Sequence, residues 1–492
     1  MPESDISRAS EVEVAIVGTG FSGIAMAHYL KKAGIESFVL LEKAGGVGGT
    51  WRENTYPGAA CDVMSHLYSF SFAPNPRWSR AFSPQPEILE YLQRVARDEG
   101  ILPHCRFRAE VRGADFDEAS GRWTVRLADG ATVRARALVL GNGGLHVPAY
   151  PDILGRERFE GPAFHSACWD QEYDVRGKRV GVIGTGASSI QVVPAIAPKV
   201  GKLSVFQRTP AWIVPRLDRA FSPLEKAIFA HVPLAQRAMR TGIYLRNELA
   251  GLAFVRGAKL AGFAEKMGRD HLRDSIPDTQ LRARLTPTYR MGCKRVLISN
   301  DYYPAFLRPN VELVTDGIAE ITARGVRTVD GKEHELDALV YCTGFLSNEY
   351  LSKVEVRGAG GRELNETWRG APETFLGITV SGFPNMFLLM GPNTGLGSNS
   401  MVFMIEAQAR YTVQCVRALR ERRLVSLDVR RDVQQDYDRE IQSKLRNTIW
   451  ASGCKSWYQS PDGRIVALWP GLTAEYWART RKLDLGQYVL KE

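Results

Sequence analysis

Residues 12–43 read VEVAIVGTGFSGIAMAHYLKKAGIESFVLLEK, and this stretch decides the fold. An apolar strand leads into the turn GTGFSG, which opens a helix, and a second apolar strand follows. Gly18 and Gly20 let the backbone turn sharply and come close to a pyrophosphate, while Gly23 lets the helix pack tightly on the strand. The positive end of the helix then faces the phosphates. The stretch therefore predicts a dinucleotide-binding unit.

A carboxylate at the end of the second strand supports this interpretation. Glu42 lies 19 residues after Gly23, where its oxygens can accept hydrogen bonds from ribose hydroxyls. The alternative is a purely structural turn, because glycine turns of this kind occur in many folds. We predict that FAD or NAD binds here.

Residues 178–209 repeat the same plan, with the strand KRVGVI, the turn GTGASS, a helix and the strand KLSVFQR. The third glycine position holds Ser189, and the second strand ends in Gln207 and Arg208 without an acid. An acid would repel the 2′-phosphate of NADPH, whereas arginine forms a charge-assisted pair with it. The second unit is thus predicted to bind NADPH and the first a flavin, although Arg208 could also be an ordinary surface residue.

The domain organisation follows from these two copies, because 492 residues are too many for one hydrophobic core. We predict an α/β fold with two Rossmann-like dinucleotide-binding domains, one for FAD and one for NADPH, and a helical insertion in the NADPH domain. The FAD domain is expected at residues 1–148 and 385–492, the NADPH domain at 149–215 and 285–384, and the insertion at 216–284. Apolar residues of the insertion are expected to pack into the core, with a membrane-surface helix as the alternative.

Charge and cysteine patterns exclude several classes of protein. The net charge of +10 comes from Lys and Arg scattered among acids, which argues against nucleic-acid binding. The seven cysteines lie far apart without a Cys-x-x-Cys pair, which argues against a zinc site, a disulfide scaffold or a redox-active dithiol. We find no signal peptide and no apolar run of about 18 residues. A soluble, cytoplasmic protein with no metal site is expected.

A longer motif narrows the class of flavoprotein. Residues 159–170 read FEGPAFHSACWD, which resembles the fingerprint of type I Baeyer–Villiger monooxygenases, Phe-x-Gly-x-x-x-His-x-x-x-Trp-Pro/Asp. Flavin-containing N- or S-oxygenases usually carry another aromatic residue in place of the tryptophan. Disulfide reductases need a cysteine pair beside the flavin, and Cys61 stands alone. All fixed positions of the fingerprint are present: Phe159, Gly161, His165, Trp169 and Asp170.

Residues 48–62, GGTWRENTYPGAACD, match a second signature of the same family. The resemblance covers nearly the whole chain, including residues 294–303 and 391–401. Residues 447–471 are similar to the branch of the family that acts on aryl and larger ketones. The matching positions of the second signature are Gly49, Trp51, Tyr56, Pro57, Gly58 and Asp62.

The resemblance implies an activity and a pair of cofactors. NADPH passes hydride to FAD, the reduced flavin adds dioxygen to give a C4a-peroxide, and the peroxide anion attacks a small-molecule ketone to form an ester or lactone. Sulfides are expected as further substrates. The anion needs a dry site and a permanent cation, and arginine stays charged at any working pH. Arg295 is the predicted cation, held by Asp62, while Lys294 is expected to reach the 2′-phosphate together with Arg208.

Structural alternatives exist for these residues. Asp62 could cap a turn, Arg295 could be a surface charge, and His165 could be a hydrogen-bonded residue in a linker. In the family, the histidine at this position lies between the domains and supports their movement. The chain as a whole could also be an N- or S-oxygenase, or a non-catalytic protein that binds FAD and NADP.

The predicted cofactor contacts form one set for each nucleotide. The flavin set is Gly18, Gly20, Phe21, Ser22, Gly23, Glu42, Gly49, Thr50, Trp51, Asp62, Tyr68, Val111 and Met401. The NADPH set is Gly184, Thr185, Gly186, Ala187, Ser188, Ser189, Arg208, Thr209 and Lys294.

Overall fold

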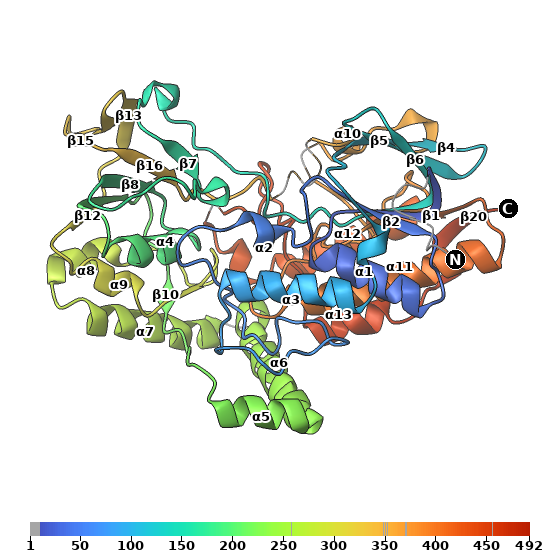
Figure 1. Ribbon diagram of the computed structural model, residues 1–492, viewed down its shortest axis with the longest axis horizontal. Helices are drawn as coiled ribbons and strands as arrows, with labels where there is room; N and C mark the ends of the chain where they lie inside the picture. The colour runs from blue at the N-terminus through green and yellow to red at the C-terminus, as the bar shows by residue number, and fades with distance from the viewer. Residues whose placement is uncertain are drawn as a thin grey trace.

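The computed structural model describes residues 10–492, apart from residues 257, 348, 350, 352, 370 and 455. Two halves, each built around a β-sheet, lie side by side, and helices α5 (Pro223–His231) and α6 (Pro233–Arg256) project beneath them (Figure 1). Two inner strands, β2 (Phe38–Glu42) and β16 (Ala338–Tyr341), are buried throughout, as expected for parallel strands that helices cover.

The first sheet is built on the N-terminal unit and has the strand order β17-β4-β5-β6-β1-β2-β3, with β18 also paired to β6. Strands β3, β2, β1, β6 and β18 form a parallel set, and β4 and β5 join β6 as an antiparallel meander. The strands are β1 (Glu11–Val17), β2 (Phe38–Glu42), β3 (Cys105–Phe107), β4 (Val111–Asp117), β5 (Arg122–Leu127), β6 (Thr132–Leu140), β17 (Glu355–Arg357) and β18 (Met386–Leu388).

Segments from both ends of the chain form this half. Helix α1 (Phe21–Lys32) packs against α11 (Met401–Glu421). Glu406 of α11 is buried, and it accepts hydrogen bonds from the Tyr29 hydroxyl (2.9 Å) and the Ser71 backbone N–H (2.6 Å). Other elements here are α2 (Thr50–Glu53), α3 (Gln85–Asp98), α10 (Leu364–Thr367), β19 (Ser426–Val429), α12 (Arg431–Leu445), α13 (Thr473–Thr480) and β20 (Tyr488–Lys491).

The second half contains a five-stranded parallel sheet in the order β12-β9-β8-β16-β7. Its central strand β8 and the helix α4 come from the second glycine-turn unit, and a small antiparallel sheet, β13-β14-β15, is attached. The elements are β7 (Ala163–His165), β8 (Arg179–Ile183), α4 (Ser189–Ile196), β9 (Lys202–Phe206), β10 (Ile213–Val214), β11 (Leu297–Ile298), α9 (Tyr302–Ala305), β12 (Val311–Val314), β13 (Ile318–Thr322), β14 (Gly325–Thr328), β15 (Glu333–Glu335) and β16 (Ala338–Tyr341).

The predicted α/β class, with two strand–turn–helix–strand units, is confirmed. The predicted boundary between the two domains at residues 384 and 385 lies too late in the chain. Strand β17 pairs with β4 through Glu355 and Gly113 and so belongs to the first sheet. The chain therefore returns to the first half before residue 385. This segment has short strands and no regular apolar period, so its sequence does not indicate which sheet it joins.

The predicted helical insertion contains α5, α6, α7 (Ala258–Ser275) and α8 (Thr279–Leu285). Phe229 and Ile243 are buried, as expected for core packing. The expectation of core packing is wrong for Leu234 and Leu249, which remain 71% and 67% exposed. These two leucines lie on a side of α6 that neither half covers. No helix within the described residues is long and apolar enough to cross a membrane.

A disulfide joins Cys293 to Cys454 across 161 residues of sequence. The sequence argument against a disulfide scaffold therefore does not extend to a single pair. Distance along the chain does not report distance in the fold, and these two cysteines have Cα atoms 6.1 Å apart, a separation that a disulfide spans.

Candidate functional site

The first glycine turn is closed so tightly that only glycine fits its key positions. Gly18 has a φ of 95°, and its N–H donates to the Leu41 carbonyl at 2.8 Å. A Cβ on Gly23 would lie 2.0 Å from the Gly18 carbonyl oxygen, and a Cβ on Gly18 would lie 2.9 Å from that of Gly141. Backbone alone thus lines the N-terminus of α1, as a pyrophosphate cradle requires.

Glu42 is held beside this turn by the protein itself. Its Oε2 accepts hydrogen bonds from the N–H and the hydroxyl of Thr19 (3.0 and 2.7 Å), and its Oε1 accepts from the Ala44 N–H (2.9 Å). A carboxylate has about four acceptor positions, two on each oxygen, so Oε1 can still accept a hydrogen bond from a ribose hydroxyl. The part played by Thr19 was not foreseen from the sequence.

The first part of the 48–62 signature packs against the turn. Gly49 has a φ of 52°, and a Cβ on it would lie 2.9 Å from the Cα of Gly20. Trp51 donates from its indole N–H to the Tyr68 hydroxyl at 3.1 Å, and the Tyr68 ring lies 5.0 Å from that of Phe21. The structure therefore brings these predicted flavin-side residues together.

The second part of the signature contacts the other half of the molecule. The Tyr56 hydroxyl donates to the side-chain carbonyl of Gln191 on α4 at 2.9 Å, and the Gln191 amide donates to the Ala60 carbonyl at 3.0 Å. A Cβ on Gly58 would lie 2.5 Å from the Gln191 backbone oxygen. Sequence reasoning missed Gln191, which has no recognisable motif of its own.

The remaining flavin-set residues lie at the starts of elements. Thr50 begins α2, Val111 begins β4 and Met401 begins α11, and Ser22 lies in the first turn of α1. Their contact with a flavin stays a prediction.

The second glycine turn repeats the closed geometry at its first position. Gly184 has a φ of 109°, and a Cβ on it would lie 2.4 Å from the Cys342 carbonyl oxygen. At Gly186, by contrast, a Cβ would meet no atom within 4 Å, so this part of the turn faces open space. Ser189 is buried at the start of α4, after Ala187 and Ser188, and the Thr185 hydroxyl donates to the Thr209 carbonyl at 2.8 Å.

Two cations meet near this turn. Arg208 is exposed at the end of β9, and Lys294 is half-buried over the Tyr289 ring. Burial lowers the pKa of Lys294, and the nearby charge of Arg208 lowers it further. Among the described residues, no carboxylate forms an ion pair with either side chain. Two neighbouring cations without an acid form a site for an anion such as the 2′-phosphate.

Asp62 and Arg295, predicted as the catalytic pair, form an ion pair. The Asp62 Oδ2 accepts from two guanidinium nitrogens of Arg295, at 2.5 and 3.2 Å, although the residues are 233 positions apart. Burial by itself would raise the pKa of Asp62, but the charge and hydrogen bonds of Arg295 outweigh it and hold the pKa below its usual value. The Asp62 charge likewise raises the pKa of Arg295. Both side chains keep about a third of their surface accessible, 32% for Asp62 and 38% for Arg295.

Two residues beside this pair were not predicted. Tyr458 is buried close enough to Arg295 for their charges to interact, and burial raises the pKa of its hydroxyl to about 12. Arg216 is half-buried, stacks on the Phe82 ring and donates to the carbonyls of Cys61 and Phe82, each at 3.3 Å. Tyr458 lies in the C-terminal stretch 447–471, so its position in that stretch was the only available signal.

The fingerprint residues lie at the edge of the second sheet. A Cβ on Gly161 would lie 2.8 Å from the Asp337 carbonyl oxygen, Phe159 packs against the core beside β13, and Trp169 packs edge-on against Phe164. Asp170 is exposed and accepts a hydrogen bond from the Glu172 N–H at 2.9 Å.

His165 contacts both connections between the two halves. It is fully buried on β7, its Nδ1 accepts from the Ala167 N–H at 3.1 Å, and burial lowers the pKa of its ring. Its ring lies 5.6 Å from that of Tyr150 and 5.4 Å from that of Phe345. Tyr150 belongs to the segment by which the chain enters the second half before β7, and Phe345 to the segment by which it leaves after β16.

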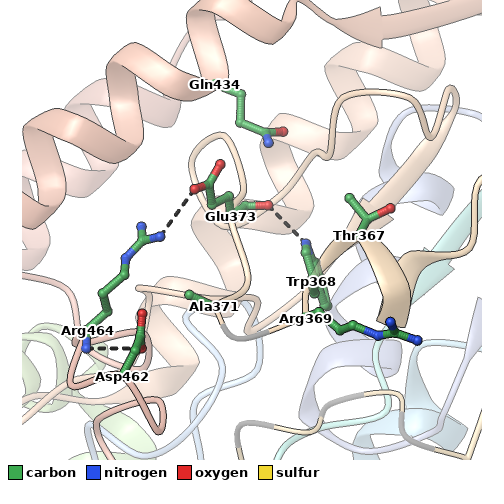
Figure 2. A pocket seen from close by; sticks show the side chains of 8 residues that line it. All are labelled: Thr367, Trp368, Arg369, Ala371, Glu373, Gln434, Asp462 and Arg464. Atoms are coloured by element: carbon green, nitrogen blue, oxygen red, sulfur yellow. Dashed lines mark hydrogen bonds and ion pairs between the residues drawn. The ribbon is translucent and has the colours of Figure 1, made fainter.

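A separate surface pocket of about 270 Å³ contains none of the predicted residues. In Figure 2, Arg464 points toward Glu373, and the Trp368 indole N–H donates to the Glu373 carbonyl at 3.1 Å. Its Arg464 already forms ion pairs with Glu373 and Asp438, and the pocket lies apart from the predicted residues, so it is not the candidate site. The lining residues are Thr367, Trp368, Arg369, Ala371, Glu373, Gln434, Asp462 and Arg464.

Comparison with named relatives decides the family. The chain is 45% identical over 484 residues to a Baeyer–Villiger monooxygenase of Pseudomonas aeruginosa, a match that covers 98% of this chain and 92% of the relative. This chain belongs to the Baeyer–Villiger monooxygenase family. A second enzyme of that name, from Streptomyces coelicolor, is 46% identical over 479 residues, with 97% of this chain and 92% of the relative covered. The model of the flavin-binding monooxygenase-like family matches residues 11–242.

Solved structures agree with this family assignment. A steroid monooxygenase bound to NADP superposes with a TM-score of 0.87 at 30% identity, over 98% of this chain and all of the other. A cyclohexanone monooxygenase from Rhodococcus sp. Phi1 bound to NADP⁺ gives 0.87 at 30% identity, over 98% and 99%. OTEMO in complex with FAD and NADP gives 0.88 at 26% identity, over 97% and 99%. The resemblance and the two-domain fold expected from the sequence are confirmed.

Proposed function

We propose that this enzyme uses NADPH and dioxygen to convert ketones into esters or lactones, with FAD at the first glycine turn and NADPH at the second. One oxygen atom enters the ester, the other leaves as water, and NADPH supplies the two electrons. The observation that supports this proposal most is the partly accessible ion pair between Arg295 and Asp62. It places a fixed cation beside the contact between the two nucleotide-binding halves. Its geometry and charge are what a Baeyer–Villiger reaction needs.

The residues present fit both cofactors. Backbone N–H groups at α1 and α4, with no room for side chains at Gly18 or Gly184, suit two pyrophosphates. Bound FAD would supply the redox chemistry, taking hydride from NADPH and activating dioxygen. The aromatic side chains of Phe21, Trp51 and Tyr68 would exclude water on one side of it.

Arg295 would stabilise the negative charge that develops on the transferred oxygen. A guanidinium stays protonated, and its low-dielectric surroundings strengthen its effect on a nearby anion. Asp62 holds the guanidinium through two hydrogen bonds, so its orientation is fixed before the substrate enters. Asp62 is thus a positioning residue for Arg295.

Selection of NADPH would rest on Arg208 and Lys294. Both cations lack an acidic partner among the described residues, and a 2′-phosphate between them would satisfy both. His165 and the other fingerprint residues would support the relative movement of the two halves, because His165 touches Tyr150 and Phe345 in the two connecting segments.

We assign residues 1–148 and 385–492, with the β17 segment, to the FAD domain, and most of 149–384 to the NADPH domain and its insertion. Oxidation of sulfides and a cytoplasmic location remain predictions.

The test is product analysis with a cyclic, an aryl and a linear ketone under ¹⁸O₂. We expect an ester or lactone that carries one labelled oxygen, formed only with NADPH present. Matched incubations in H₂¹⁸O under unlabelled dioxygen should leave the inserted ring or ester-bridge oxygen unlabelled, and only the carbonyl oxygen can acquire label, by exchange of the ketone with water. Consumption of NADPH without ester from any ketone, together with sulfoxide from an aryl sulfide, would instead indicate an S-oxygenase.

A further inference from the structure

The disulfide between Cys293 and Cys454 lies next to the residues of the proposed site. Cys293 is buried and immediately precedes Lys294 and Arg295 in the chain. The Cys454 backbone N–H also donates to the Cys293 sulfur at 3.3 Å. The bond therefore joins the segment that carries Lys294 and Arg295 to the C-terminal stretch 447–471.

That stretch also carries Tyr458, a buried residue near the catalytic pair. Tyr458 follows Cys454 by four residues, is buried, and interacts electrostatically with Arg295 and Asp62. Farther along, the Asn393 side-chain amide donates to the carbonyls of Ile465 and Leu468, at 2.8 and 3.1 Å. The end of the stretch is thus fixed to the first half by hydrogen bonds, and Cys454 is joined to the Arg295 segment by a covalent bond.

We propose that Cys293 and Cys454 are a positioning pair, whose disulfide keeps Tyr458 against the Arg295–Asp62 pair and so couples NADPH oxidation to ester formation. This inference rests on the function proposed above. Opening the bond frees the Arg295 segment from Cys454, while Asn393 still holds the end of the 447–471 stretch. The Arg295 guanidinium, which is already partly accessible, then loses its fixed position, and reducing equivalents are lost to hydrogen peroxide instead of ester.

The bond forms by a balanced two-electron oxidation. Each thiol gives up one proton and one electron to a peroxide, the two sulfurs bond, and the peroxide O–O bond breaks to release water. Hydrogen peroxide or an organic hydroperoxide is the class of oxidant required. The other cysteines do not compete for this pairing, because Cys61, Cys105, Cys342 and Cys415 are buried and Cys168 is exposed elsewhere, in the fingerprint segment.

The first measurement establishes the bond in the full-length enzyme with FAD bound. Peptide mapping without reductant should find the residue 293 and 454 peptides joined, and treatment with a phosphine reductant should separate them. The reductant is then removed by desalting under argon, so that it cannot react with peroxide during turnover. Air-oxidised enzyme carried through the same steps is the reference.

Two readouts separate positioning from simple stabilisation. In the reduced enzyme, ester formed per NADPH consumed should fall about tenfold, since a misplacement of about 1 Å near the chemistry can cost ~10²-fold. The KM for NADPH should rise, while anaerobic flavin reduction at saturating NADPH should keep its rate. Reoxidation with dilute hydrogen peroxide should restore both values. The double variant C293S/C454S should show the same coupling and KM as reduced wild type, and the reductant should not change them. Cys168→Ser should change on reduction as wild type does.

Three outcomes would overturn the proposal. One is the absence of joined peptides in the oxidised enzyme. Another is that reduction of the disulfide lowers the melting temperature but changes neither the ester formed per NADPH nor the KM for NADPH. That result would show that the bond only stabilises the fold. The third is a reductant response that persists in the double variant. If no ketone gives ester at all, the proposed function fails by itself, and the KM for NADPH and the peroxide released per NADPH still report on the disulfide.

Discussion

At the scale of single residues, Arg295 has the most specific role. Its guanidinium is accessible, fixed by Asp62 and adjacent to the buried Tyr458. Arg295→Ala should reduce ester formation several hundredfold or more, because removal of one preorganised partner of a developing charge costs about 3–4 kcal/mol. Anaerobic reduction of the flavin by NADPH, followed by stopped-flow absorbance, should persist, because the glycine turn and the 2′-phosphate contacts would be intact.

Arg295→Lys provides the conservative comparison. It keeps the positive charge but loses the two-nitrogen contact with Asp62, so partial ester formation is expected. If Arg295→Ala still made ester at a rate comparable to wild type, Arg295 would not be the catalytic arginine. Loss of flavin reduction as well would assign it to NADPH placement.

We predict that Arg208 determines the choice between the two nicotinamide cofactors. Arg208→Ala should raise the KM for NADPH about tenfold to a hundredfold, the effect of losing one charged hydrogen bond of roughly 1.5–3 kcal/mol, and leave the KM for NADH nearly unchanged. Initial rates with both cofactors measure this. Arg176→Ala is the matched control, because Arg176 is an exposed arginine of the same half, paired with Asp174. Equal losses with NADPH and NADH would make Arg208 structural.

The charge of Asp62 gives a stability effect with a defined direction in pH. Its folded-state pKa is held below the usual value, so its contribution to folding is present above about pH 4 and is lost as the pH falls through the lower folded-state value. Asp62→Asn should therefore melt at a lower temperature than wild type at pH 7. The difference should shrink as the pH falls below about 4. A difference that stays constant with pH would show that the charge is not responsible.

At the scale of elements, Glu248 attaches α6 to the first half. Its buried carboxylate accepts hydrogen bonds from the Asn399 side chain (2.6 Å) and the Thr473 hydroxyl (2.7 Å). Glu248→Ala should lower the free energy of unfolding by about 2–4 kcal/mol, since these donors would be left buried without an acceptor. Urea denaturation measures this, and Glu421→Ala, in an exposed ion pair with Arg417, should have little effect. Equal stability of both variants would mean that α6 is held by other contacts.

Elements with a strong local signal were predicted correctly. The two glycine turns could be identified because the requirement for glycine is local, as at Gly18 and Gly23, and because each turn lies between a buried strand and a helix. The position of β17 could not be predicted, since three residues carry no period. The exposed face of α6 was missed for a related reason, because leucine at helical spacing does not show whether a partner covers it.

At the scale of the whole molecule, the site depends on contacts between distant segments. Asp62 and Arg295 could be nominated only by family resemblance, because no spacing rule brings residues 233 positions apart together. Tyr458, Gln191 and the Cys293–Cys454 bond were beyond reach for the same reason. Tertiary packing alone makes them neighbours.

The contact between the 48–62 segment and α4 limits how this enzyme can be recombined with its relatives. Tyr56, Gly58 and Ala60 fit against Gln191 so closely that the loop and the helix share one surface. A chimera that exchanges the NADPH-binding half at its two chain crossings would therefore split a matched pair. The second half and the 48–62 segment therefore form one unit, although the 48–62 segment belongs to the first half by its place in the sequence. Recombination libraries should exchange the two together.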